Sequence, residues 1–314
     1  MKKISFLVLV VLFFVSLFIG VHEVTFADIL AGNEIEWFLL MQTRIPRTIS
    51  LVLAGGTLGV CGMIMQHMMQ NRFVSANTIG MMDSARLGIL LVMLFLPNHS
   101  ILLRSSVAFL FAYAGVLLFL GLRCWLPKGD QMILPLTGVM FGNIIGSIAT
   151  FFAYQFQLVQ NVSSWMQGNF STVMQGSYEL LYVTIPVFLL LYYFGYQITI
   201  AGLGETTAKN LGMNYQVLQW GIFALVALGS SAVLIMVGNI PFLGVVVPNL
   251  VSLFYGDHLK STLGMTAITG SIFLVFCDIL ARIIIPPYEV PVSVVVGVLG
   301  GGLFIFLLLW RKRK

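Results

Sequence analysis

Long runs without charged side chains are the feature that most constrains this chain. Such runs fall at about 4–21, 48–66, 78–97, 105–122, 132–154, 180–197, 216–238, 240–255, 261–283 and 290–310. A helix needs about 20 mainly apolar residues to cross the hydrocarbon of a bilayer, and most of these runs approach that length. They are too long and too uniformly apolar for the alternating strands of a membrane β-barrel.

The composition agrees with this interpretation. Of the 314 residues, 59% are hydrophobic and 9% are charged, whereas soluble domains carry about 25% charged residues. A water-soluble globule is therefore excluded. The sequence predicts an all-α polytopic membrane protein of about ten transmembrane helices, with one domain over residues 1–314.

The first run follows Lys2 and Lys3, as in a signal sequence, but Val21–Ala27 is a poor small-residue cleavage site. We interpret the run as an uncleaved first helix. An even number of spans places both termini on one side. Because the two tails are basic, at Lys2 and Lys3 and at Arg311–Lys314, that side is predicted to be the cytoplasm.

This threading puts all but four of the 16 Lys and Arg residues on the inner side. The exceptions are Arg44, Arg47, Arg104 and Arg282. Because they oppose the positive-inside bias, we expect them to have a role on the outer face. The alternative for Arg44 and Arg47 is that their side chains only reach lipid headgroups.

Two features of the spans concern packing. The run 240–255 is short and contains Pro241 and Pro248, so its backbone must be buried in protein or line a cavity. Glycines four apart, at 55 and 59 and at 297 and 301, let helices approach closely.

Two loops hold most of the extramembrane sequence. The outer one, about 155–179, contains Trp165–Phe170, where aromatic residues beside a glycine suit a short helix at the interface. This helix is either an anchor or a contact for a partner.

The inner loop, about 198–215, predicts a second short helix. Gly204 ends the preceding segment, Glu205 favours a helix start, and Gly212 is a natural stop. A helix of about two turns is marginal alone, so it must dock on something. Ala208 and Leu211 share one face, which fits either a groove on a partner or the chain's own bundle.

Signatures of catalysis and of metal binding are missing from the sequence. No G-x-x-x-x-G-K-[ST], H-E-x-x-H or G-x-S-x-G pattern occurs, so the chain cannot hydrolyse ATP alone. The histidines and cysteines are scattered without ligand spacing, at His22, His67, His99, His258, Cys61, Cys124 and Cys277. We expect no enzyme activity, no cofactor and no metal site.

Asp278 and Arg282 lie four residues apart near the outer end of the run 261–283. On a helix they share one face and can neutralise each other. The pair is a proton relay, a fixed pair beside a polar pathway, or an ion pair that positions a helix.

Several motifs occur together in a fixed order along the chain. They are Arg44-Ile45-Pro46-Arg47, Met65-Gln66, Thr137-Gly138-Val139, Trp165-Met166, the segment 204–212, Phe242–Pro248, Asp278–Arg282 and Glu289-Val290-Pro291-Val292. In these motifs the chain resembles the FecCD-type permeases, the membrane subunits of ATP-driven importers for iron-siderophores, haem and cobalamin. Within that family, Met82–Gly88 looks most like permeases for siderophores of the petrobactin and anguibactin kind.

The resemblance implies a location in the bacterial cytoplasmic membrane and a set of partners. They are a second permease, identical or homologous, a dimer of cytoplasmic ATPases, an extracytoplasmic binding protein and a ferric siderophore as substrate. It also implies site residues: Gly204, Glu205, Ala208, Leu211 and Gly212 for ATPase coupling, and Arg44, Arg47 and Arg282 for docking of the binding protein.

The alternative from another class is a secondary transporter in which Asp278 carries a proton. A membrane enzyme is disfavoured, because no nucleophile, base or metal ligands are clustered in the sequence.

Overall fold

The computed structural model describes residues 2–20, 34–96, 100–123, 125, 133–256 and 258–312. Some residues used in the sequence analysis lie outside the described ones, namely Val21–Ala27, which includes His22, and also His99 and Cys124. Cys61 and Cys277 are buried and free.

Helices occupy each of the ten predicted runs. They are α1 (Lys2–Phe18), α4 (Ile45–Met68), α5 (Met81–Phe95), α6 (Ile101–Arg123), α7 (Ile133–Gln155), α9 (Thr184–Tyr193) with α10 (Gly195–Ala201), α12 (Tyr215–Val237), α13 (Leu243–Tyr255), α14 (Leu259–Ile283) and α15 (Val292–Lys312). Among the described residues, six helices are long and apolar enough to cross a membrane, or seven if the bent α9–α10 segment is one span. The fold is thus that of a helical membrane protein, and the total of about ten spans stays a prediction.

Helical structure also extends beyond the predicted spans. The helix α3 (Glu34–Leu39) continues through a π-helical turn, η1 (Leu40–Arg44), into α4. The outer loop contains α8 (Val159–Met166), and the inner loop contains α11 (Glu205–Asn210). Short 3-10 turns, η2 (Asn77–Ile79) and η3 (Glu179–Val183), precede α5 and α9.

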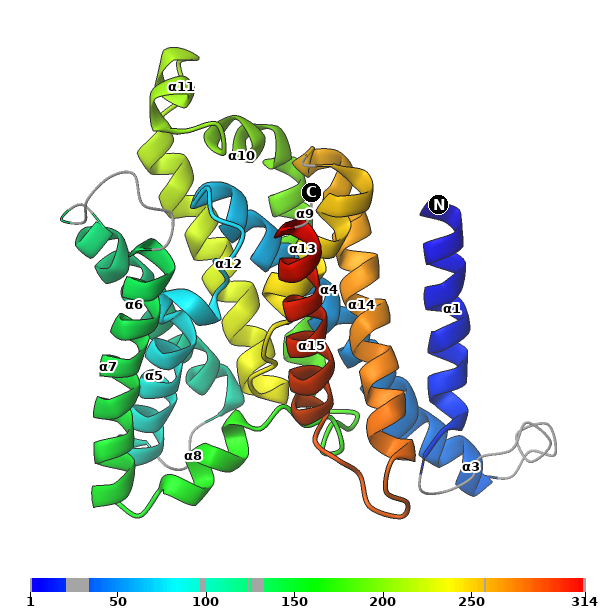
Figure 1. Ribbon diagram of the computed structural model, residues 1–314. Helices are drawn as coiled ribbons and strands as arrows, with labels where there is room; N and C mark the ends of the chain where they lie inside the picture. The colour runs from blue at the N-terminus through cyan, green and yellow to red at the C-terminus, as the bar shows by residue number, and fades with distance from the viewer. Residues whose placement is uncertain are drawn as a thin grey trace.

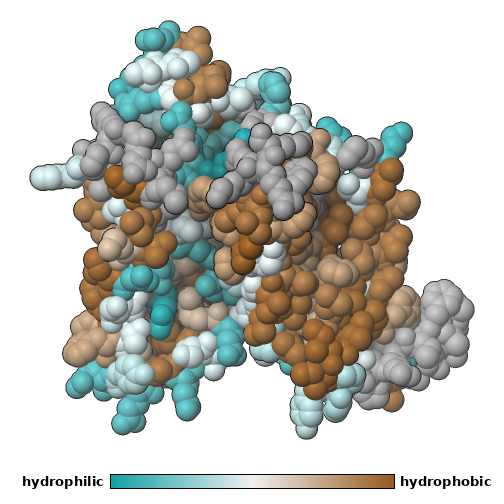
Figure 2. All heavy atoms as spheres, viewed as in Figure 1, coloured by the Kyte–Doolittle hydropathy of each residue, from teal (hydrophilic) through white to brown (hydrophobic). Residues whose placement is uncertain are grey.

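The two ends of the bundle carry different elements. The start of α1, the end of α15 and the projecting α11 lie at one end, whereas α3, α8 and the connection from α14 to α15 lie at the other (Figure 1). The two loops therefore lie at opposite ends of the bundle, and which end faces the cytoplasm stays a prediction. Figure 2 shows hydrophobic residues covering the α14 and α15 side of the visible face, as a lipid-facing surface requires.

The helix α4 is the centre of the bundle and packs against α14, α13 and α12. Glycines allow two of these contacts. A Cβ atom on Gly55 would lie 2.5 Å from the backbone oxygen of Gly270 in α14, and one on Gly62 would collide with the backbone of Gly244 in α13. The predicted packing role of Gly55 thus has a specific partner.

The short helix α13 has an unusual start and middle. Phe242, just before it, adopts a left-handed backbone with φ of 60°, which is uncommon for a residue other than glycine. Pro248 inside the helix has no N–H for the Gly244 carbonyl. The side-chain amide of Gln66 approaches this oxygen at 3.4 Å, so α4 compensates for the missing donor. The helix is only 13 residues long, and the expectation that this run is short and interrupted agrees with its Pro248 and its left-handed start.

We expect Gly55→Ala to lower the melting temperature of the purified protein, because the new methyl group must displace the backbone of α14. Overpacking of this kind costs about 1–3 kcal/mol. The matched control is Gly264→Ala on α14, where a Cβ atom meets nothing within 4 Å. Equal melting temperatures for the two variants would contradict the close α4–α14 contact.

Candidate functional site

A cluster of charged side chains lies buried at the end of the bundle that holds α3 and α8. Asp278 of α14 is 0% exposed and accepts hydrogen bonds from Arg47 of α4, at 3.2 Å from Nε and 2.7 Å from Nη2. Arg282 contacts the other oxygen of the same carboxylate. Arg47 also donates through Nη1 to Glu289, at 2.7 Å, in the segment that joins α14 to α15. The cluster therefore ties α4, α14 and this segment together.

The same arginines hold the end of α1. Arg282 Nη1 donates to the backbone oxygens of Ser16 and Ile19 at 2.9 and 2.7 Å, and Arg44 Nη1 donates to Ile19 at 2.7 Å. The last carbonyls of a helix have no partner within the helix and carry partial negative charge, so cations bind there favourably. We refer to Arg44, Arg47, Asp278, Arg282 and Glu289 as the charge cluster.

The structure changes the expectation for the docking arginines. Arg47 and Arg282 are 7% and 5% exposed, and both are paired with Asp278, so neither forms an open cationic pocket. Arg44 is only partly buried. A role of these three arginines in docking stays a prediction, and a partner that uses Arg47 or Arg282 must compete with carboxylates of the chain itself.

Arg104 and Glu289, at the same end of the bundle, have partners that the sequence does not predict. Arg104 of α6 lies over the ring of Trp165 in α8, with 5.4 Å to the ring centroid, a distance that suits a cation–π contact. Glu289 belongs to the cluster although the sequence predicts no role for it. The signal for Glu289 in the sequence is its position a few residues after Asp278 and Arg282, at the start of the motif Glu289-Val290-Pro291-Val292.

The helix α11 projects from the opposite end (Figure 1). It begins after Gly204, with φ of 111°, and ends before Gly212, with φ of 77°. The N–H of Met213 bonds to the Ala208 carbonyl, and that of Gly212 to Lys209, which is the Schellman arrangement. Glycine is needed at both ends because these backbone angles strain other residues.

The exposed face of α11 differs from the expected one. Ala208 is 0% exposed and packs against the chain itself, whereas Leu211 is 62% exposed. Ala208 and Leu211 thus do not present one common face to a partner. Leu203 is exposed beside the helix, and Glu205 and Lys209 form an exposed ion pair at 2.7 Å. The surface that α11 offers therefore includes the apolar side chains of Leu203 and Leu211 and this ion pair.

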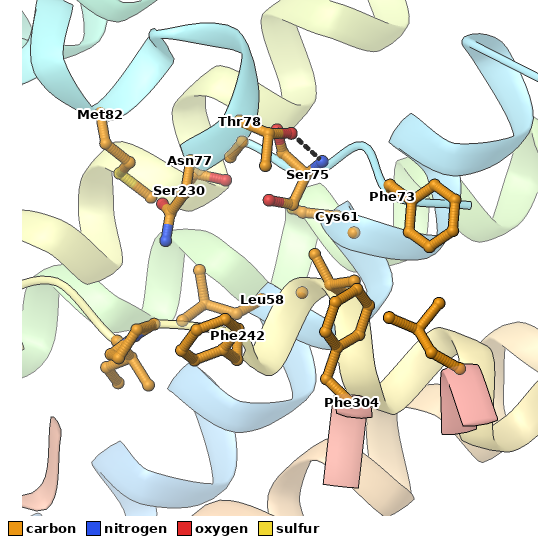
Figure 3. A pocket seen from close by; sticks show the side chains of 17 residues that line it. Leu58, Cys61, Phe73, Ser75, Asn77, Thr78, Met82, Ser230, Phe242 and Phe304 are labelled. Carbon is orange, nitrogen blue, oxygen red and sulfur yellow. Dashed lines mark hydrogen bonds between the residues drawn. The ribbon is translucent and has the colours of Figure 1, made fainter. Parts of the chain in front are cut away.

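Between the two ends, a cavity of about 530 Å³ lies among α4, the segment before α5, α13 and α15. Figure 3 shows the rings of Phe242 and Phe304 on one side of it and the polar side chains of Ser75, Asn77 and Thr78 on another. The two rings stack with centroids 6.5 Å apart. The cavity thus offers aromatic surface and hydrogen-bonding groups together.

Comparison with known proteins identifies the family. The model of the FecCD transport family matches residues 8–310. The chain belongs to the FecCD transport family. Permeases of this family work in ATP-driven importers with a separate ATPase, a second permease and a substrate-binding protein. The chain is accordingly one transport subunit and not an enzyme, and a proton-coupled secondary transporter is not favoured.

Relatives match almost the whole chain. The petrobactin import system permease protein YclN of Bacillus subtilis is 46% identical over 308 residues, covering 98% of this chain and 97% of that protein. The ferric-anguibactin transport system permease protein FatD of Vibrio anguillarum is 38% identical over 294 residues, covering 94% of each. A metal-chelate type ABC transporter solved in an inward-facing conformation shares the fold, with a TM-score of 0.83, 22% identity and coverage of 98% and 99%.

Proposed function

We propose that this permease carries a ferric siderophore of the petrobactin and anguibactin kind into the cytoplasm. The supporting observation is the 46% identity to a petrobactin permease over 98% of the chain. The cavity beside Phe242 and Phe304 supports the same proposal, because its aromatic rings and polar groups suit an iron chelate with a mixed surface.

In this proposal the two ends of the bundle have different partners. The surface of α11 contacts the ATPase, and the end that holds the charge cluster receives the binding protein. A ligand shifts a conformational equilibrium only through different affinities for the two states. ATP binding to the partner ATPase shifts this equilibrium more than binding of the transported ligand does. The cavity opens to alternate sides of the membrane in response.

The charge cluster supports a structural role for Asp278 rather than a proton-carrying one. Two guanidinium groups, of Arg47 and Arg282, contact its carboxylate, so this side chain joins α4 to α14. Proton uptake by Asp278 would remove the charge that holds both ion pairs. A proton carrier would have to lose and re-form these two contacts in every transport cycle.

Uptake into liposomes tests the proposal. The permease, its ATPase and its binding protein are reconstituted together, and entry of ferric petrobactin labelled with ⁵⁵Fe is followed. We expect uptake with ATP on the ATPase side and none with an imposed proton gradient alone. Uptake driven by the proton gradient without ATPase would instead support the secondary transporter.

A further inference from the structure

A stripe of polar side chains runs along one side of α7. It consists of Asn143, Ser147, Thr150 and Tyr154, spaced by four, three and four residues, and it faces Asp83 and Arg86 of α5 across a groove of about 470 Å³. We refer to these six residues as the α5–α7 groove. Figure 2 shows hydrophilic residues running down the visible face between α7 and α15.

Asp83 and Arg86 lie in the run 78–97, which the sequence predicts to span the membrane, so we do not expect them to face hydrocarbon. Ionisable residues within membrane-spanning helices lie against protein or a water-filled pathway, because exposure to lipid costs several kcal/mol. A core between two subunits is also a poor match, since the centres of protein interfaces are depleted of charged residues. A water-filled pathway is the environment that fits the α5–α7 groove.

Two glycines of α7 make room for the Asp83 carboxylate. A Cβ atom on Gly142 would lie 2.7 Å from Asp83 Oδ2, and one on Gly146 would lie 3.2 Å from Oδ1. Within the described part of the chain, Asp83 forms no ion pair and accepts no hydrogen bond from another side chain. The carboxylate is therefore accommodated by the helix packing but is not neutralised by it.

The polar groups of the groove retain unused hydrogen-bonding capacity. The hydroxyl groups of Ser147 and Thr150 donate to backbone oxygens one turn earlier, at 2.8 and 2.7 Å, which leaves their oxygens as acceptors. Arg86 Nη2 donates to Thr150 over a long 3.4 Å, and its buried Nε has no partner among the described residues. The groove thus offers several acceptors, led by Asp83, beside one incompletely bonded guanidinium group.

We propose that the α5–α7 groove is a contact site for the transported chelate, and that it takes a chelate carrying ammonium or N–H donors next to anionic iron-binding oxygens. Asp83 and the two hydroxyl oxygens accept from the donors, and Arg86 faces the anionic oxygens. The inference rests on the proposed function, because it assigns a subsite to the same cargo.

The test compares uptake by variants of the complete transporter in liposomes, with ⁵⁵Fe-labelled ferric petrobactin as the probe. Hydrogen bonds to a charged group contribute about 1.5–3 kcal/mol, so Asp83→Asn and Arg86→Gln should each slow uptake about tenfold or more. Ser147→Ala should slow it about threefold. The matched control is Ser106→Ala on α6, whose hydroxyl is also exposed and donates to the carbonyl four residues earlier, at 2.9 Å.

Assembly with the ATPase and binding-protein affinity are measured on the same samples. Slow uptake by properly assembled groove variants, with Ser106→Ala at the wild-type rate, supports the site. Unchanged uptake in the groove variants overturns it, and so does loss of the permease dimer, which would make the groove a subunit contact. If the wild-type transporter takes up no ferric petrobactin, the proposed substrate is wrong, and the assignment of the groove to that substrate is rejected with it.

Discussion

The Asp278→Asn variant should be strongly destabilised, with a melting temperature well below that of the wild type. Asp278 is fully buried and is shared by Arg47 and Arg282. The neutral amide is the same size but leaves two guanidinium groups without their common counter-charge. Removing one partner of a buried ion pair costs about 3–5 kcal/mol, a large fraction of the stability of most domains.

Thermal unfolding in detergent, followed by circular dichroism, measures this effect. Asp83→Asn is the matched control, because it removes the same charge from α5, where the carboxylate has no ion pair within the described residues. We expect the control to melt near the wild type. A wild-type melting temperature for Asp278→Asn, with loss of proton-driven uptake, would instead assign Asp278 to proton transfer.

The second large effect is expected at Leu211, where Leu211→Asp should abolish association with the ATPase. Leu211 is 62% exposed at the end of α11, so the substitution leaves the permease fold intact. It places a charge where an apolar contact is proposed, at a cost of several kcal/mol, or at least about a hundredfold in affinity.

Co-purification and binding of the ATPase to the detergent-solubilised permease measure the loss. The control is Tyr288→Asp, an equally drastic change at a residue 75% exposed at the opposite end of the bundle. Normal ATPase binding by Leu211→Asp would show that α11 does not form the coupling surface. Ala208→Asp would be a poor test, because it puts a charge into the permease's own packing.

Much of the fold follows from the pattern of charges in the sequence. Uncharged runs mark the helices because lipid penalises charge, and Gly204 and Gly212 mark the ends of α11 because their backbone angles favour glycine. The break between α9 and α10, bent by 61°, was not predicted. The sequence through Phe194 and Gly195 is apolar in either case, so it does not distinguish a straight helix from a bent one. The bent segment packs α10 against α14, a long-range contact that no local pattern predicts.

The charge cluster could be predicted only in part. The contact between Asp278 and Arg282 follows from a spacing of four on one helix. The contacts of Arg47 with Asp278 and Glu289 join residues 231 and 242 positions apart, and no local pattern carries that information. The burial of Ala208 could not be predicted for the same reason. It depends on which neighbouring elements cover one face of α11, a helix of only six residues.

The attachment of α1 also implies an order of events during synthesis. Arg282, which binds the carbonyls of Ser16 and Ile19, follows them by 266 and 263 residues. At roughly 5–20 residues per second, the ribosome needs about 13–53 s to make this stretch. Arg44 lies only 25 residues after Ile19 and donates to the same carbonyl. The emerging chain can therefore hold its first helix in place through Arg44 until the insertion of α14 completes the attachment.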